Sequence, residues 1–181
     1  MNIPITLNGN KIILDSRPEE SLMSVLRKKN CQSVKCGCNG GSCGSCTVLM
    51  NDSPVASCRI PVGIIRDNDI VTLDYFAGTK EYTAITQGFE LAGIKLCGYC
   101  DAGKIFLTYQ ILKSNKLFTK QEIINQVKGL APCCTDLNTL CKGIMLAVET
   151  YNKGYDVVVK KYRLNQKNTK TGSQDNKWNQ Y

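Results

Sequence analysis

The loop that decides the fold reads Cys36-Gly37-Cys38-Asn39-Gly40-Gly41-Ser42-Cys43-Gly44-Ser45-Cys46. Three of its cysteines follow the pattern C-x4-C-x2-C, and Cys58 lies in the segment after the loop. The glycines between the cysteines permit positive φ angles, so the loop can curve tightly and bring backbone N–H groups close to the sulfurs. The pattern therefore predicts a site built from thiolates.

The spacing of Cys38, Cys43, Cys46 and Cys58 matches the plant-type ligand pattern for a [2Fe–2S] cluster, C-x4-C-x2-C…C. Such a cluster needs four thiolates, and we expect the loop to supply three of them and a strand to supply Cys58. The alternatives are structural zinc and disulfides. Structural zinc usually has cysteine pairs separated by about a dozen residues or more, unlike this glycine-rich loop. The spacing favours the cluster.

The composition excludes several classes of protein. Hydrophobic residues make up 43% of the 181 residues, which is enough for a packed core. No apolar run approaches the ~20 residues of a membrane-spanning helix, and the N-terminus lacks the pattern of a secretory signal. Eleven cysteines and no histidine argue against a disulfide framework, a mixed Cys/His zinc site and a Rieske centre. We therefore expect a cytoplasmic protein whose clustered thiols hold metal. Cys31 and Cys36, outside the spacing, are interpreted as small buried or loop residues.

The two halves of the chain together predict an α+β fold. Alternating or apolar runs predict strands at residues 3–7, 11–14, 47–50, 55–60 and 70–73. A first helix, with Ser16 as its capping residue, is expected to run towards Asn30. Apolar residues at helical spacing predict a small bundle of four helices, at about 83–91, 103–113, 123–128 and 140–151. A capping box at Thr119 opens the third of these helices, and residues 75–80 are the expected linker.

Two further stretches carry a resemblance to a known family. Residues 34–48 closely resemble the cluster loop of the xanthine dehydrogenase and aldehyde oxidoreductase family, and residues 20–27 resemble its first helix. Residues 87–103, which include Cys97-Gly98-Tyr99-Cys100, resemble the start of its second, helical [2Fe–2S] domain. The resemblance covers roughly residues 3–150. The pairing of the ferredoxin motif with this second motif distinguishes the family from other electron carriers.

The resemblance implies a fold and a function. The fold is an N-terminal β-grasp, plant-type ferredoxin domain (1–76) followed by a four-helix-bundle [2Fe–2S] domain (82–155) and a basic C-terminal tail (156–181). The chain would carry two [2Fe–2S] clusters and pass electrons from a molybdenum–pterin centre on a large subunit towards FAD, on a flavin subunit, or another acceptor. The reaction would be the hydroxylation of a purine, an aldehyde or a related heterocycle. No substrate chemistry is expected on this chain.

The resemblance also implies ligands for the second cluster, with departures from the family pattern. The family uses C-x2-C and then C-x-C, whereas residues 132–134 read Pro132-Cys133-Cys134. The expected ligands are Cys97, Cys100, Cys133 and Cys134, with Cys141 as a substitute. Adjacent cysteines on an extended chain point in different directions, so both ligate only if the loop bends. Leu96 also replaces a glutamine that in the family touches the pterin, and Asp101-Ala102 replaces Thr-Pro.

Two other functions remain open at this stage. These departures would fit a divergent accessory or regulatory iron–sulfur protein with one cluster and no molybdenum partner. The net charge is +8, and the last 31 residues hold seven basic and two acidic side chains, which would fit a zinc or nucleic-acid module. The tyrosines form no recognisable stacking platform. We therefore expect neither a nucleic-acid nor a membrane partner.

Overall fold

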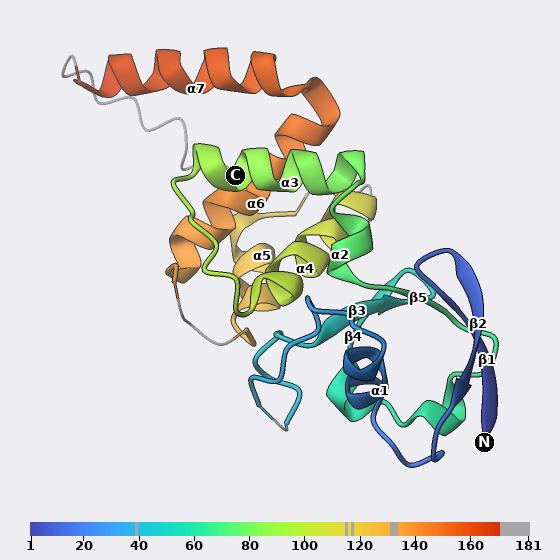
Figure 1. Ribbon diagram of the computed structural model, residues 1–181. Helices are drawn as coiled ribbons and strands as arrows, with labels where there is room; N and C mark the ends of the chain where they lie inside the picture. The colour runs from blue at the N-terminus through green and yellow to red at the C-terminus, as the bar shows by residue number, and fades with distance from the viewer. Residues whose placement is uncertain (39, 115, 117, 131–133, 171–181) are drawn as a thin grey trace.

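The chain folds into a sheet part followed by a helical part (Figure 1). The computed structural model describes residues 1–38, 40–114, 116, 118–130 and 134–170, and within 166–170 only the backbone. Two apolar cores correspond to the two parts, and the core of the helical part extends to Leu49 in the sheet. The expected α+β fold is confirmed at this level.

The strands of the described residues form one mixed five-stranded sheet in the order β2-β1-β5-β3-β4. Neighbouring strands are antiparallel except β1 and β5, which are parallel. The strands are β1 (Asn2–Leu7), β2 (Asn10–Asp15), β3 (Thr47–Met50), β4 (Ser53–Ala56) and β5 (Asp69–Val71). Both hairpins close on residues with positive φ, Asn8-Gly9 and Asn51-Asp52, as tight two-residue turns require.

Helix α1 (Leu22–Lys28) covers the sheet and buries Leu22, Val25 and Leu26. Its N-cap is Ser21, whose hydroxyl accepts from the Ser24 amide, so the prediction that Ser16 caps this helix was wrong. The reason is tertiary: residues 18–22 hydrogen-bond to residues 60–63 instead of starting the helix. The amide of Leu22 donates to the carbonyl of Ile60 at 2.7 Å, and Ser21 and Pro61 form a bridge.

Two predicted strands end earlier than the sequence indicated. The strand expected at 55–60 stops at Ala56 and gives way to the 3-10 turn η1 (Ser57–Arg59), so Cys58 lies on a turn and not on a strand. The hydroxyl of Ser57 donates to the Cys46 carbonyl at 2.7 Å, which fixes this turn beside the cysteine loop. The strand expected at 70–73 ends at Val71, and the short helix α2 (Leu73–Phe76) overlaps the expected linker. A second 3-10 turn, η2 (Val62–Ile64), follows η1.

The helical part packs four helices around one core. They are α3 (Lys80–Leu91), α4 (Asp101–Lys113), α5 (Lys120–Val127) and α6 (Leu137–Lys153). The capping box at Thr119 is present: its hydroxyl accepts from the Glu122 amide, and the Glu122 carboxylate accepts from the Thr119 amide. A further helix, α7 (Tyr155–Lys170), lies along the outside in the region that the sequence indicated only as a basic tail (Figure 1). Among the described residues, no helix has the length and apolarity needed to span a membrane.

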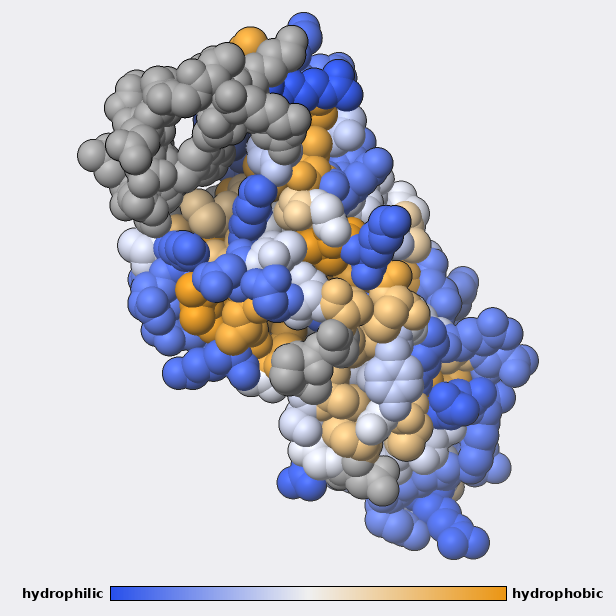
Figure 2. Space-filling model, turned by 90° about the vertical axis from the view of Figure 1, so that its left-hand side faces the viewer, coloured by the Kyte–Doolittle hydropathy of each residue, from blue (hydrophilic) through white to orange (hydrophobic). Residues whose placement is uncertain are grey.

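Helix α4 joins the two parts because it packs on β3 and β4 of the sheet (Figure 1). Near its C-terminal end, the Tyr109 hydroxyl donates to the Asp52 carboxylate at 2.7 Å, and Lys113 pairs with the same carboxylate. Asp52 lies at the tip of the β3–β4 hairpin. On the face shown in Figure 2, apolar residues reach the surface in the middle of the molecule, and hydrophilic residues surround them.

The tightest packing in the helical part lies between α3 and α6. A Cβ added to Gly88 would lie 2.3 Å from the amide nitrogen and 2.4 Å from the Cα of Ala147. These are backbone atoms, which cannot move without shifting α6 as a whole. The absence of a side chain at Gly88 therefore sets the spacing of the two helices.

We predict that Gly88→Ala destabilises the protein although alanine is the better helix former. The steric cost should exceed the ~1 kcal/mol gained in helix propensity, because overpacking a core costs about 1–3 kcal/mol or more. Denaturant unfolding should show a lower midpoint with an unchanged slope. Gly78→Ala is the control, since its Cβ would make only an ordinary 3.6 Å contact with the Tyr75 carbonyl. An unchanged midpoint for Gly88→Ala would contradict this account.

Candidate metal centres

The first cysteine loop directs backbone amides at its own sulfurs. The amide of Cys43 donates to Cys38 Sγ at 3.4 Å, and the amide of Ser45 donates to Cys43 Sγ at 3.4 Å. The Ser42 hydroxyl also approaches Cys38 Sγ at 3.8 Å. Such donors stabilise negative charge on sulfur, which a metal-bound thiolate carries. The loop is therefore arranged for anionic sulfur.

The three cysteines of this loop and Cys58, on the turn η1, meet in two pairs. The Cys43 side chain hydrogen-bonds to Cys38, and the Cys46 side chain hydrogen-bonds to Cys58. Within the described residues, no three His, Cys, Asp or Glu side chains gather around a single point as one ion requires. Two pairs are nevertheless what a binuclear cluster uses, because each of its two irons takes two protein ligands. The donor set thus fits a [2Fe–2S] cluster better than a single zinc ion.

Cys38 and Cys58, the first and last cysteines of this group, differ in pKa. The backbone amide of Cys43, together with the Cys43 thiol and the Gly40 amide, lowers the pKa of Cys38 to about 6. Burial, followed by the neighbouring Cys46, raises the pKa of Cys58 to about 11. The donors around Cys38 thus favour its thiolate form, whereas the surroundings of Cys58 favour its thiol form, so metal binding has to displace a proton there.

Glycines give the loop its tight curvature. A Cβ on Gly37 would lie 2.7 Å from Ser45 Oγ and 2.9 Å from Cys43 Sγ. Gly41 and Gly44 have φ angles of +80° and +74°, which other residues rarely adopt. A side chain at Gly37 would therefore collide with Ser45 and Cys43, and a side chain at Gly41 or Gly44 would strain the backbone of the loop.

The second cysteine motif forms a turn at the start of α4. The Gly98 amide donates to both carboxylate oxygens of Asp101, at 3.2 and 3.0 Å, and Gly98 has a φ of +85°. The Lys35 ammonium, next to the first cysteine loop in sequence, donates to the Gly98 carbonyl. Cys100 is buried and Cys97 is exposed. This turn is thus fastened both to its own helix and to the sheet part of the molecule.

A lysine side chain lies at the second group of thiols. Lys104 Nζ is 3.3 Å from Cys100 Sγ and 3.3 Å from Cys134 Sγ. Lys104 is only 2% exposed, and a buried cation is stable only beside negative or strongly polar partners. Two sulfurs around a buried ammonium fit an anionic thiolate site. The structure therefore brings together two of the sequence-predicted ligands, Cys100 and Cys134.

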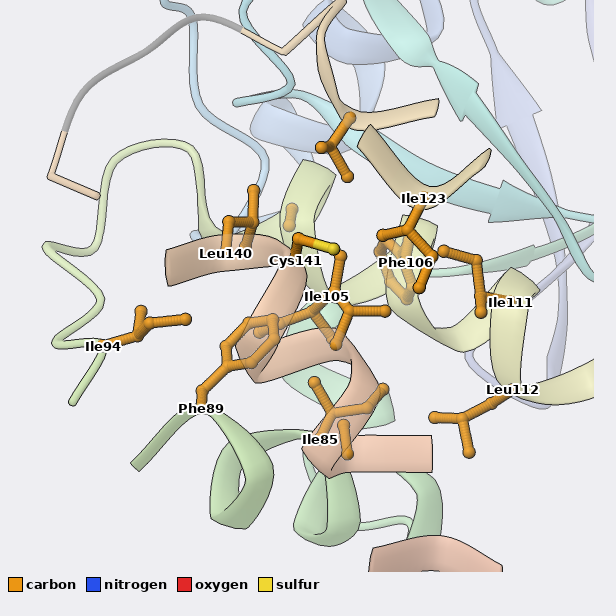
Figure 3. Packing of buried hydrophobic residues seen from close by; sticks show 14 of the residues in the cluster. Ile85, Phe89, Ile94, Ile105, Phe106, Ile111, Leu112, Ile123, Leu140 and Cys141 are labelled. Atoms are coloured by element: carbon orange, nitrogen blue, oxygen red, sulfur yellow. The ribbon is translucent and has the colours of Figure 1, made fainter. Parts of the chain in front are cut away.

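Of the remaining candidate ligands of the second site, Cys133 lies outside the described residues, as does Pro132, and Cys141 lies in the helical core. Cys141 is fully buried in the helical core, where burial raises its pKa, and its sulfur donates to the Lys120 carbonyl at 3.6 Å. Figure 3 shows its sulfur among apolar side chains of the core. Leu96 is partly buried against the same core.

The two cysteine groups approach each other through two glycines. A Cβ on Gly103 would lie 2.8 Å from the Cα of Gly44, and one on Gly44 would lie 3.1 Å from the Cα of Gly103. Gly44 lies between Cys43 and Cys46, and Gly103 lies three residues after Cys100. The backbones of the two motifs are therefore in direct contact.

Sequence analysis missed three residues that shape these sites: Lys35, Asp101 and Lys104. The departure at Asp101 was noted, but not its bond to the Gly98 amide. Lys104 had a detectable signal, since it follows Cys100 by one helical turn among the apolar residues of α4. Lys35 had none, because its partner is distant in the sequence.

The comparisons with known proteins agree with this geometry. A 2Fe-2S iron-sulfur cluster binding domain matches residues 5–63, and a [2Fe-2S] binding domain matches residues 72–145. The chain is 33% identical over 150 residues to the nicotinate dehydrogenase small FeS subunit of Eubacterium barkeri, covering 82% of this chain and 96% of that one. It is 29% identical over 147 residues to the xanthine dehydrogenase iron-sulfur-binding subunit of Escherichia coli O157:H7, covering 80% of this chain and 92% of that one.

A solved structure shows the same similarity in three dimensions. A chain of quinoline 2-oxidoreductase from Pseudomonas putida 86 superposes with a TM-score of 0.75 at 26% identity, covering 86% of this chain and 98% of that one. Matches to two [2Fe–2S] binding domains confirm the expectation of two clusters. The chain belongs to the family of iron–sulfur subunits of the xanthine dehydrogenase and aldehyde oxidoreductase type, the molybdenum hydroxylases.

Proposed function

We propose that this chain is the electron-transfer subunit of a molybdenum hydroxylase, linking a molybdenum–pterin centre on a partner to FAD or another acceptor. The observation that carries the proposal is the backbone contact between Gly44 and Gly103, because it brings the two cysteine groups side by side. A bound [2Fe–2S] cluster supplies one-electron transfer. The chain's own residues hold, orient and shield that group at two neighbouring points.

For the first cluster we propose Cys38, Cys43, Cys46 and Cys58 as the ligands. Their pairing, their spacing and the amides aimed at Cys38 and Cys43 support this set. The hydrogen bond from Ser57 to the Cys46 carbonyl holds the turn with Cys58 against the loop.

For the second cluster we propose Cys97, Cys100, Cys133 and Cys134, with Cys141 as a substitute for one of them. The approach of Cys100 and Cys134 to a common Lys104 ammonium supports two members of the set. The bond from Cys141 to the Lys120 carbonyl gives its sulfur a separate structural partner, which favours Cys133 as the ligand.

Each of the two proposed cluster sites belongs to its own domain. We propose a β-grasp ferredoxin domain over residues 1–76, a four-helix-bundle domain over 82–155 and a basic C-terminal segment over 156–181. The order of the sheet and the packing of α3 to α6 support the first two assignments. Helix α7, which runs through the third segment as far as Lys170, contacts α6.

The partner is a molybdopterin-bearing large subunit, with FAD on a further subunit, in a cytoplasmic complex. Support comes from relatives whose names describe small or iron–sulfur subunits of nicotinate and xanthine dehydrogenases. A purine, an aldehyde or a related heterocycle is the proposed substrate class of the complex. Purification from the source organism under gentle conditions tests this: the chain should copurify with a large subunit that contains molybdenum.

A second candidate is an accessory iron–sulfur protein with one cluster. The specific observation in its favour is the sequence Pro132-Cys133-Cys134, which departs from the C-x-C pattern that the family uses for its second cluster. Electron paramagnetic resonance of the dithionite-reduced protein separates the two candidates. Two [2Fe–2S] signals with distinct g values support the electron-transfer subunit, and one signal with no molybdenum partner supports the accessory protein.

We predict that Cys43→Ser removes the first [2Fe–2S] signal and leaves the second, because serine oxygen replaces one of the paired thiolates. The measurement is spin quantification after anaerobic reduction, together with iron analysis. Cys36→Ser is the matched control in the same loop, exposed and outside the ligand spacing. Loss of the first signal in Cys36→Ser, or its survival in Cys43→Ser, would refute the proposed ligand set.

The second ligand set gives a separate prediction. Cys133→Ser should abolish the second signal, whereas Cys141→Ser should retain it and lower stability by about 1 kcal/mol, since a small polar side chain replaces a buried thiol. Spin counts and denaturant midpoints of both variants provide the measurement. The reverse pattern of spin counts would make Cys141 the ligand.

The contact between the sites can be tested directly. Gly103→Ala should force the sheet part and the helical part away from each other, because the new Cβ would lie only 2.8 Å from the Cα of Gly44. The magnetic interaction between the two reduced clusters should weaken, and stability should fall by about 1–3 kcal/mol. Gly78→Ala serves again as the control. An unchanged interaction in Gly103→Ala would show that this contact does not set the separation of the sites.

A further inference from the structure

Lys104 is a buried lysine on α4 that the proposed ligand sets do not use. It is 2% exposed and belongs to a helix whose next two residues, Ile105 and Phe106, are also buried. Lysine is almost never fully buried unless its charge is paired. Its position therefore calls for an explanation from its contacts.

The contacts of Lys104 bridge two distant parts of the second site. Cys100 precedes it by one turn of α4, and Cys134 comes from the segment before α6. Nζ lies 3.3 Å from each of the two sulfurs. The backbone around it is anchored, since the Lys104 carbonyl accepts from the Thr108 hydroxyl at 2.7 Å. The ammonium is thus held at both thiols by a regular, well-packed helix.

We propose that Lys104 is a positioning and tuning residue for the second [2Fe–2S] cluster, which donates N–H···S hydrogen bonds to Cys100 and Cys134 and makes that cluster easier to reduce. The inference goes beyond electron transfer as such and rests on the presence of the second cluster. Reduction adds one electron to the cluster and therefore one negative charge, and no bond or proton at Lys104 changes. A fixed positive charge in a low-dielectric site favours the more negative state. Hydrogen bonds to cluster sulfurs act in the same direction.

The first site differs from the second in the charge of the hydrogen-bond donors to its sulfurs. There, within the part of the chain that the structure describes, the donors to the sulfurs are backbone amides and the Ser42 hydroxyl, which carry no net charge. Charge-assisted hydrogen bonds are roughly twice as strong as neutral ones. Lys104 should therefore separate the potentials of the two clusters within one chain.

The test is a redox titration of the full chain, followed by electron paramagnetic resonance of both clusters. In Lys104→Met the ratio of reduced to oxidised second cluster, at a fixed potential, should fall at least tenfold, which is about 59 mV for a one-electron couple. The first cluster is the internal reference and should not shift. Lys95→Met is the matched control, because it removes the same charge from an exposed position two residues before Cys97.

Further variants separate tuning from a purely structural role. Lys104→Arg keeps the charge and should therefore retain most of the ratio of reduced to oxidised second cluster. Lys104→Gln keeps a hydrogen-bond donor without the charge, so its ratio should lie between those of Lys104→Met and the native chain. Two signals in the native chain with no shift in Lys104→Met overturn the inference alone. If the native chain instead gives only one signal, the second cluster is absent and the inference about Lys104 loses its basis. Loss of the second signal in both neutral variants overturns tuning and makes Lys104 an assembly residue.

Discussion

The backbone contact between Gly44 and Gly103 is the constraint on which the arrangement of the two sites depends. Neither residue has room for a side chain: a Cβ on Gly103 would lie 2.8 Å from the Cα of Gly44, and a Cβ on Gly44 would lie 3.1 Å from the Cα of Gly103. Because Gly44 belongs to the first cysteine loop and Gly103 to the start of α4, this contact fixes how two independently formed motifs face each other. The spacing of each motif would produce a metal site on its own, and this contact, together with the bond from Lys35 to the Gly98 carbonyl, brings the two motifs side by side.

The two sites stabilise sulfur by different physical means. The first uses amides of its own loop, and their effect is visible in the pKa of about 6 for Cys38. The second uses a side-chain cation, Lys104, between Cys100 and Cys134. Amides that point at the sulfurs depend on a tightly curved, glycine-rich backbone, whereas a lysine needs only a regular helix. This difference explains why the first loop is rich in glycine and the second motif continues directly into α4.

Local patterns predicted most of the fold. The strands, the capping box at Thr119 and the main helices could be inferred because they depend on neighbours in sequence. The cap of α1 could not, because residues 18–22 bond to residues 60–63. For the same reason Cys58 was placed on a strand, although Ser57 bonds to Cys46 and ends it. The cysteine spacing predicted the first site. The position of Lys104 one turn after Cys100 could be seen in the sequence, but its approach to Cys134 could not, since Cys134 is distant in sequence.

Helix α4 is fastened to the sheet at both of its ends. Gly103 contacts Gly44 near its N-terminus, and Tyr109 and Lys113 bind Asp52 of the β3–β4 hairpin towards its C-terminus. Two contacts at opposite ends of α4 restrict rotation of the helical part against the sheet part. Such an arrangement would make the chain a stiff spacer and not a hinged pair of domains. Since electron tunnelling falls off steeply with distance, such stiffness would give every molecule nearly the same transfer rate, with no need for a conformational search between steps.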